Sequence, residues 1–324
     1  MIISSFLLTF ARFYAKVMDY LFLVIALGLI VGGAMLLTDG SVALARRLHI
    51  PEFIVGLTVV AVGTSMPEMA VSMISTVAGY GDMAIGNVVG SNIANTLLIL
   101  GVCAMFAPVV LTKSNIRRDI PLNIAVSIAL LIVAYTSGAI RRVEGILLLA
   151  GYVAMIWYSV RADRKAMAAE EQPVEDVSMW RVVFLIVAGL AGLIYGGDIF
   201  VDSATSIAKA WGVSEAVIAI TLVAVGTSLP ELAASLASIL KGSASLALGN
   251  VIGSNIANIL LILGACSTVA PLKLAGVGMV DISVVVATSV LLLLSALFIG
   301  NKKITRFEGF IFLAIYVVYI YTLL

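Results

Sequence analysis

The sequence predicts an all-α polytopic membrane protein, with ten transmembrane helices in two inverted five-helix repeats. The first observation is composition: of 324 residues, 62% are hydrophobic and only 11% are charged. A soluble domain carries roughly 25% charged and about 45–50% apolar residues, so lipid is the expected solvent. The second observation is an internal duplication, and the third is an odd number of apolar segments in each copy. A net charge of +1 without a basic stripe gives no indication of a nucleic-acid partner.

Apolar segments long enough to span a bilayer, about 20 residues each, define the predicted spans. They lie near residues 20–45, 53–78, 84–107, 119–137, 143–160, 180–209, 215–240, 247–270, 280–299 and 305–323. Residues 1–19 place an apolar stretch before Arg12 and Lys16, the reverse of a signal peptide, and we interpret them as a leader or surface segment. Residues 20–160 and 180–324 then form the two repeats, joined by a polar linker over 161–179.

The duplication aligns residues 54–101 with 217–264 without a gap at an offset of 163, and 28 of the 48 pairs are identical. A match of this extent indicates two copies of one structural unit. The same offset pairs Asp39 with Asp202. Because each copy has five spans, the second copy enters the membrane from the opposite side. Inverted repeats of this kind are typical of secondary transporters, whose ion sites lie near the membrane midplane.

Loop charges predict the orientation in the membrane. Alternate loops on one side carry thirteen Lys and Arg residues, and the loops on the other side carry six. Lys and Arg favour cytoplasmic loops, so the richer side, which includes Lys113, Lys241 and Lys303, is expected to face the cytoplasm. Both termini of this multi-pass protein of the cell (inner) membrane are then expected outside the cytoplasm.

Each repeat carries the motif Gly-Thr-Ser-x-Pro-Glu within its second span, ending at Glu68 and Glu231. A charged side chain at that depth costs roughly 2.5–3.5 kcal/mol, and the sequence offers no Lys or Arg at matching depth. The missing counter-charge is therefore expected to be a bound cation. Thr64 and Ser65 precede Glu68 by four and three residues, which predicts one shared helix face. Pro67 is expected to kink the helix.

The third span of each repeat carries a second polar cluster, Gly-Asn-x-x-Gly-Ser-Asn-Ile-Ala-Asn, ending at Asn95 and Asn258. Ser91 and Ser254 lie one turn before these asparagines. With the glutamates they would supply only oxygen ligands, which suit Na⁺, Ca²⁺ or a similar hard cation. The alternative is that these amides and hydroxyls only hold helices together by hydrogen bonds.

With these motifs the chain resembles the sodium/calcium exchangers of the calcium/cation antiporter superfamily, most closely the short prokaryotic members without a regulatory domain. The resemblance covers residues 20–324. It implies that sodium is exchanged for calcium as the first and sixth spans slide across the core to alternate access. It implies no enzyme activity and no cofactor, and the partners it implies are sodium and calcium ions and the lipid bilayer.

The resemblance also implies a set of ion ligands by position. It contains the acidic ligands Glu68 and Glu231, the hydroxyls of Ser65 and Ser228, the backbone carbonyls of Ala61, Thr64, Ala224 and Thr227, the residues Ser91 and Ser254 that complete the flanking sodium sites, and Asn95 and Asn258 at the centre. Some relatives, including potassium-dependent ones, carry Asp in place of Asn258. Asparagine at this position leaves two formal negative charges, which weakens a potassium-dependent interpretation.

Other functions fit parts of the pattern. A proton/calcium, potassium-dependent or other divalent-cation antiporter is the runner-up, although the hydroxyls beside each glutamate favour sodium. A passive cation channel fits less well with charges buried at mid-depth in inverted repeats. An intramembrane hydrolase fits least, because His49, the one histidine, lies in a predicted loop. Asp39, Asp198 and Asp202 lie toward span ends, and the simplest interpretation is interfacial anchoring.

Overall fold

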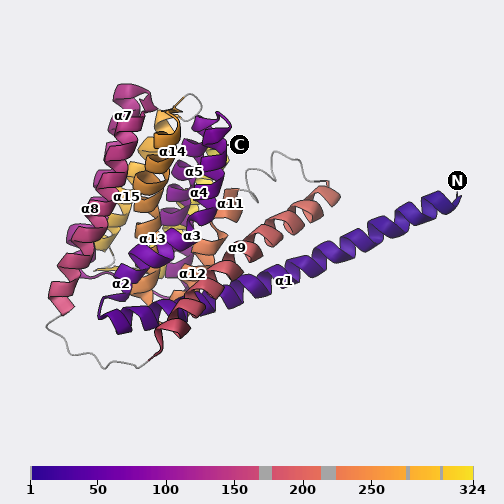
Figure 1. Ribbon diagram of the computed structural model, residues 1–324, viewed down its shortest axis with the longest axis horizontal. Coiled ribbons are helices and arrows are strands. Elements are labelled where there is room, and N and C mark those ends of the chain that lie inside the picture. Colours follow the sequence, from indigo (N-terminus) through magenta and orange to yellow (C-terminus); the bar gives the residue numbers. More distant parts are fainter. Residues whose placement is uncertain (1, 168–176, 213–223, 275–277, 300–301, 324) are drawn as a thin grey trace.

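The computed structural model describes residues 2–167, 177–212, 224–274, 278–299 and 302–323. This part of the chain is helical apart from four two-residue strands (Figure 1). In the first half the elements are α1 (Ile2–Leu48), α2 (Glu52–Val55), η1 (Gly56–Val60), α3 (Ala61–Thr64), α4 (Met66–Val77), α5 (Gly81–Ile93), η2 (Ala94–Ile99), α6 (Leu100–Phe106), β1 (Val109–Val110), η3 (Asn115–Asp119), α7 (Ile120–Ser137), β2 (Ala139–Ile140) and α8 (Arg142–Met167). The label η marks a π-helical turn.

In the second half, the described elements repeat much of this order. They are α9 (Met179–Ala210), α11 (Ala224–Thr227), α12 (Leu229–Leu240), α13 (Ala244–Ala257), η5 (Asn258–Leu263), α14 (Gly264–Val269), β3 (Leu272–Lys273), α15 (Met279–Leu294), η6 (Ser295–Ile299), β4 (Lys303–Ile304) and α16 (Arg306–Leu323). The π-helical turns η2 and η5 follow α5 and α13 at matching positions of the two repeats.

Eight helices in the described part of the chain are long and apolar enough to cross a membrane, and a ninth span is formed by a bent pair, Glu52–Thr64 with Met66–Val77. The chain is therefore a multi-pass, all-helical membrane protein. Their bounds agree with nine of the ten predicted spans to within a few residues. Of the predicted span near 215–240, the first part lies outside the described residues, and α11 and α12 form the rest.

Two expected boundaries differ from the helices. α1 begins at Ile2, so the segment 1–19, which we expected to precede the first span, belongs from Ile2 onward to the same helix. α8 continues to Met167, which is past the predicted start of the linker at residue 161. Residues 168–176 of that linker lie outside the described residues.

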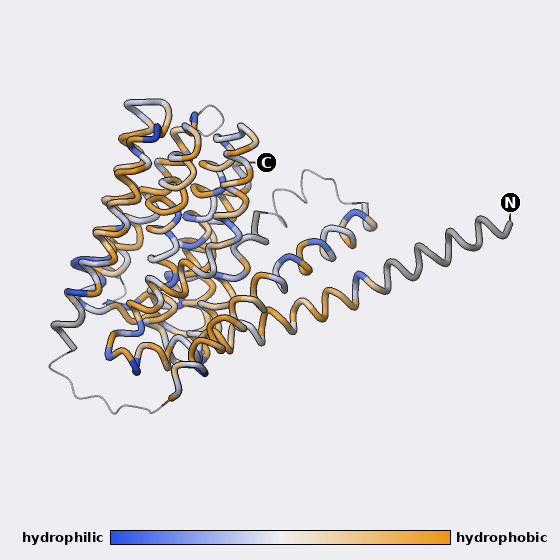
Figure 2. The backbone as a smooth tube through the Cα atoms, in the orientation of Figure 1, coloured by the Kyte–Doolittle hydropathy of each residue, from blue (hydrophilic) through white to orange (hydrophobic). Residues whose placement is uncertain are grey.

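The centre of the bundle is formed by the third span of each repeat. In the 18-residue apolar stretch of Ala244–Val269, 94% of the residues are buried within the protein, and in that of Gly81–Phe106 the share is 78%. The fifth spans lie at the periphery, because only 22% of the apolar stretch of Arg142–Ala162 and 17% of that of Arg306–Leu323 is buried within the protein. Figure 2 shows apolar residues along most of α8 and hydrophilic residues near its lower end, as expected for a helix that faces lipid.

Helices α1 and α9 form a pair of their own beside the bundle (Figure 1). Their backbones touch at glycines: a Cβ placed on Gly189 would lie 2.5 Å from the backbone nitrogen of Leu37. Buried apolar side chains of the pair, including Ile30 and Leu193, belong to a smaller cluster that is separate from the main core. The two helices are therefore packed more closely with each other than with the rest of the protein.

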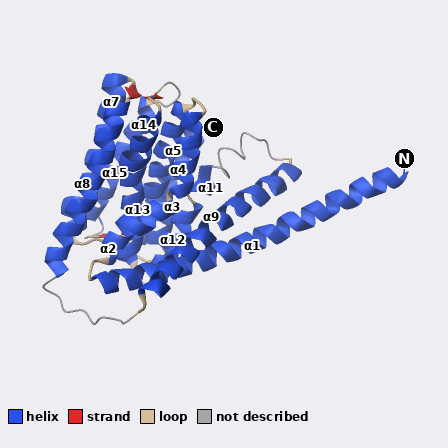
Figure 3. Cartoon of the chain, viewed as in Figure 1, coloured by secondary structure: helices blue, strands red, loops and turns tan. Residues whose placement is uncertain are grey.

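Short strand pairs join loops at the two ends of the bundle (Figure 3). β1 pairs antiparallel with β4, and β2 pairs antiparallel with β3. The first pair joins loops that follow the third and ninth predicted spans, and the second pair joins loops that follow the fourth and eighth. Each pair thus connects loops that the span count places on the same side of the membrane.

The glycine contact between α1 and α9 generates a prediction with a matched control. A Cβ on Gly33 would lie 2.8 Å from both Gly189 O and Leu193 N, whereas a Cβ on Gly32 has nothing within 4 Å. We expect Gly33→Ala to lower the thermal unfolding temperature in detergent, since overpacking costs about 1–3 kcal/mol. Gly32→Ala should leave it unchanged or raise it slightly, because alanine favours helix. Equal unfolding temperatures for the two variants would contradict this packing.

Candidate functional site

Both motif helices break at the serine of the motif. α3 ends at Thr64, Ser65 leaves the helical conformation (φ −81°, ψ 9°), and α4 begins at Met66, with a bend of 47° between the two parts. The second repeat does the same at Ser228 (φ −90°, ψ 4°), between α11 and α12. The proline that follows each serine lacks an N–H and cannot continue the hydrogen-bond ladder of the preceding turn. The predicted kink is confirmed.

The break places each glutamate in the first turn of a new helix. Glu68 lies in the first turn of α4 and Glu231 in the first turn of α12, and both are 1% exposed. The unpaired N–H groups at a helix N-terminus carry a partial positive charge, which stabilises a nearby carboxylate. Each carboxylate is thus buried and partly compensated by its own helix.

Each glutamate also accepts a hydrogen bond from the serine of the other repeat. Ser65 Oγ donates to Glu231 Oε1 at 2.8 Å, and Ser228 Oγ donates to Glu68 Oε1 at 3.3 Å. Helical spacing predicts that Ser65 and Glu68 share one helix face, but this holds only for a regular helix, and the helix breaks at Ser65. Ser65 lies 3.1 Å from Ser254 Oγ as well. The motifs therefore form one cluster that neither repeat can form alone.

Two asparagines outside the predicted ligand set donate hydrogen bonds to the backbone carbonyls of the glutamates. Asn87 Nδ2 donates to Glu68 O at 3.2 Å and to Ser72 Oγ at 3.0 Å. Asn250 Nδ2 does the same in the second repeat, with Glu231 O at 3.3 Å and a serine hydroxyl at 2.9 Å. All of these residues recur at the repeat offset, and that recurrence is the signal by which the sequence could have identified them.

Four buried oxygen atoms at this cluster have no hydrogen-bond partner among the described residues. They are Oε2 of Glu68 and Glu231 and Oδ1 of Asn95 and Asn258. The elements that carry them are packed together: η2 contacts α12, and η5 contacts α4. A buried acceptor without a donor costs about 1–3 kcal/mol, and more if it is charged. A cation is the kind of ligand that would compensate all four.

Of the other predicted ligands, Ala61, Thr64 and Ser254 contact residues of this cluster. Ala61, Thr64, Ser91 and Ser254 are buried, and Ser254 Oγ is 3.5 Å from Ala61 O. Thr64 Oγ1 donates to Asn250 Oδ1 at 3.2 Å. The set also includes two residues of α11, of which Thr227 is half-buried and Ala224 has a described backbone but no described side chain. Ion ligation by this set remains a prediction.

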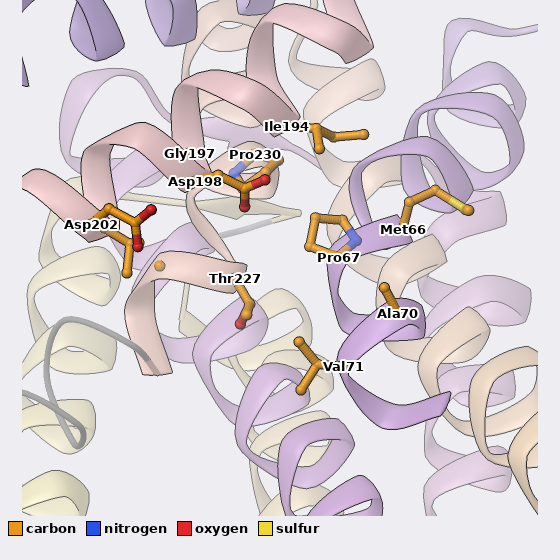
Figure 4. A pocket seen from close by; sticks show the side chains of 12 residues that line it. Met66, Pro67, Ala70, Val71, Ile194, Gly197, Asp198, Asp202, Thr227 and Pro230 are labelled. Carbon is orange, nitrogen blue, oxygen red and sulfur yellow. The ribbon is translucent and has the colours of Figure 1, made fainter. Parts of the chain in front are cut away.

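A cavity of about 560 Å³ leads to both helix breaks (Figure 4). It lies between α4 and α9 and is lined by Pro67, Thr227 and Pro230 at the breaks and by Asp198 and Asp202 on α9. The sequence interpretation of these aspartates as interfacial anchors stays a prediction, and the structure adds that both line this cavity.

The chemistry of the cluster is that of a hard-cation site. Its polar atoms are carboxylate, hydroxyl, amide and backbone oxygens, which suit Na⁺ or Ca²⁺. In the described part of the chain no three His, Cys, Asp or Glu side chains converge in a way that could hold a metal ion. A cation here would depend on two carboxylates and on neutral oxygens, which permits binding that is reversible.

Comparison with known proteins agrees with this chemistry. The chain is 31% identical to a sodium/calcium exchanger of Methanosarcina acetivorans, over 93% of this chain and 98% of that one. It is 35% identical to an inner membrane protein of Escherichia coli (strain K12), over 77% and 79% of the two chains. The structure of the sodium-calcium exchanger NCX_Mj soaked with zero Na⁺ and Ca²⁺ superimposes with a TM-score of 0.83 and 32% identity, covering 95% of this chain and 99% of that one. A model of the sodium/calcium exchanger protein family matches residues 18–161 and 181–324, and the chain therefore belongs to this family.

Proposed function

We propose that this chain exchanges sodium for calcium across the membrane at one site shared by its two repeats. The observation that carries the proposal is the reciprocal pair of serine–glutamate hydrogen bonds, which leaves one oxygen of each carboxylate without a partner among the described residues. Membership of the sodium/calcium exchanger family supports the choice of ions. The proposed ligands are the twelve predicted residues around Glu68 and Glu231.

Competition for the same oxygens explains how the two fluxes are coupled. Two carboxylates are neutralised by one Ca²⁺ or by two Na⁺, and a third Na⁺ would make the occupied site positive. An empty site keeps two buried negative charges, which are costly to move through a low-dielectric barrier. Only the occupied protein then changes between the two access states, so each ion returns in exchange for the other.

The proposed arrangement has ten spans in two inverted repeats, with 1–19 continuing the first helix and 161–179 linking the halves. Eight described helices and one bent pair support it, and so does Ser228 between α11 and α12, whose backbone angles are close to those of Ser65 in that pair. The two strand pairs also connect loops as alternation between the two sides requires. In the inner membrane, loop charges then place both termini outside the cytoplasm.

The structure has different contacts at the two ends of the site. Toward the proposed cytoplasmic end α1 packs on α12, with Thr38 and Ser238 hydroxyls 3.3 Å apart and Lys241 Nζ 2.5 Å from Asp39 Oδ1. Toward the other end, the cavity between α4 and α9 reaches the helix breaks. We assign this conformation to the outward-facing state, in which the α1–α9 pair has yet to slide.

The first prediction concerns the carboxylates. In liposomes that contain the protein, an imposed sodium gradient should drive uptake of labelled calcium, and Glu68→Gln or Glu231→Gln should reduce that uptake to background because the charge that holds the cation is lost. Glu52→Gln, the same substitution at the start of the same broken span, should retain it.

Ion replacement separates the alternatives in the same assay. Uptake that follows a proton gradient without sodium would favour a proton/calcium antiporter, and a requirement for potassium would favour a potassium-dependent one. Calcium flux that ignores an opposing sodium gradient would indicate a channel. Sodium-driven uptake that survives both glutamate substitutions would overturn the proposed site.

The second prediction concerns the ion pair at the closed end. Lys241 corresponds in the repeat to Ala78, and Asp39 corresponds to Asp202, so the pair exists on one side only. Lys241→Ala should shift the protein toward the inward-facing state by about 1.5- to 5-fold, the value of an exposed ion pair. Adding Ala78→Lys should increase the shift, because the new lysine favours closure onto Asp202.

The shift is measured by alkylation of a cysteine at Val71, which lines the outer cavity, since both native cysteines are buried. The rate should fall in Lys241→Ala and fall further in the double variant. Lys303→Ala, which removes an exposed lysine from β4 at the same end, is the control. An unchanged alkylation rate in both variants would contradict the assignment of Lys241.

A further inference from the structure

The third spans cross at four buried asparagines, of which two are outside the proposed ligand set. Asn92 on α5 is 1% exposed and Asn255 on α13 is 2% exposed. Asn92 Nδ2 donates to the backbone carbonyl of Asn255 at 3.2 Å, and Asn258 Nδ2 donates to Asn92 Oδ1 at 2.9 Å. These bonds form a chain that runs from the backbone of α13, through a side chain of α5, back to the first residue of η5.

These two hydrogen bonds determine which side-chain atom of Asn258 points away from Asn92. A backbone carbonyl only accepts, so Asn92 must turn its NH₂ group toward Asn255 O. The side-chain oxygen of Asn92 then points at Asn258, and Asn258 must donate a hydrogen bond to it from its NH₂ group. The oxygen of Asn258 is therefore turned away from Asn92, and this buried oxygen has no partner among the described residues. η5, which begins at Asn258, packs against α4, the helix of Glu68.

The second repeat does not offer the same support to Asn95. By the repeat offset Asn255 should orient Asn95 as Asn92 orients Asn258. Asn255 Nδ2 instead donates to Thr96 Oγ1 at 2.9 Å, and the residue that corresponds to Thr96 is Ile259, which has no hydroxyl. A hydroxyl both donates and accepts, so this contact does not determine which way an amide is turned.

We propose that Asn92 is a positioning residue that holds the side-chain oxygen of Asn258 toward the transported cation. The inference rests on the proposed function, because it takes Asn258 as a ligand. If Asn258 were free to rotate, it would present its NH₂ group to the cation part of the time, and a dipole of the wrong sign repels a divalent ion more strongly than a monovalent one. Asn92 thus contributes to the preference for calcium over sodium.

The test is sodium-driven calcium uptake by the full chain in liposomes. Asn92→Leu, which keeps the approximate volume and removes both hydrogen bonds, should raise the calcium concentration for half-maximal uptake about tenfold, as for the loss of one charge-assisted contact. The half-maximal sodium concentration should rise about threefold, since the interaction scales with ion charge. Asn92→Ala, which cannot overpack the crossing of α5 and α13, should give the same ratio.

Two comparisons separate positioning from a general packing role. Asn255→Leu, at the corresponding and equally buried position, should change the calcium-to-sodium ratio much less. In an Asn258→Ala background, Asn92→Leu should add no further change in calcium half-saturation, because the oriented group is gone. A lower maximal rate with an unchanged ratio in both Asn92 variants would overturn the inference alone. Absence of sodium-driven uptake in the unmodified protein would overturn the proposed function itself.

Discussion

The burial of two carboxylates at the centre of a lipid-embedded protein is the constraint on which the rest of this structure depends. Glu68 and Glu231 are each 1% exposed, and an ion taken from water into a protein interior loses several kcal/mol of solvation, an order-of-magnitude cost. A helix N-terminus and one serine hydroxyl offset part of this lost solvation energy for each carboxylate. It leaves one oxygen of each without a donor among the described residues. The protein is thus built to be completed by a cation, which is a requirement for a carrier that must not move empty.

Sharing the compensation between the repeats makes the site depend on their association. Ser65 serves Glu231 and Ser228 serves Glu68, so a shift of one repeat against the other changes the environment of both carboxylates together. The helix breaks permit this, since a serine outside the helical conformation can direct its hydroxyl across the interface. The cavity beside α9 reaches both breaks, at Pro67 and Pro230, and each of these prolines directly precedes a buried glutamate. The same few hydrogen bonds therefore join the two repeats and determine which carboxylate oxygens are left for the ion.

The sequence predicted what depends on composition and repetition, and it failed where a contact depends on the path of the backbone. Apolar segment length identified the spans, and the duplicated glutamate marked the candidate site, because both signals can be recognised from the order of residues alone. The crossed pairing of Ser65 with Glu231 was missed, since helical spacing places Ser65 beside Glu68 until the chain breaks. The cavity beside Asp198 and Asp202 was not predicted, because depth in a span does not show whether a cavity reaches a side chain. The orientation of Asn258 depends on the Asn92 amide of another helix, α5, and no sequence pattern contains this contact.

The positions at which the repeats differ are as informative as those at which they agree. Two identical inverted repeats would make the outward- and inward-facing states equal in energy and would support the two central asparagines equally. Lys241, which corresponds to Ala78 in the first repeat, forms an ion pair with Asp39 of α1 at one end only. Thr96, which corresponds to Ile259 in the second repeat, accepts a hydrogen bond from Asn255, so Asn255 does not orient Asn95 as Asn92 orients Asn258. The duplication thus supplies the shared site, and a small number of differences between the repeats determine which end closes more firmly and which asparagine is held in a fixed orientation. In a carrier of this kind, the balance between the two access states and the ion preference depend on this asymmetry and can change without alteration of the carboxylates.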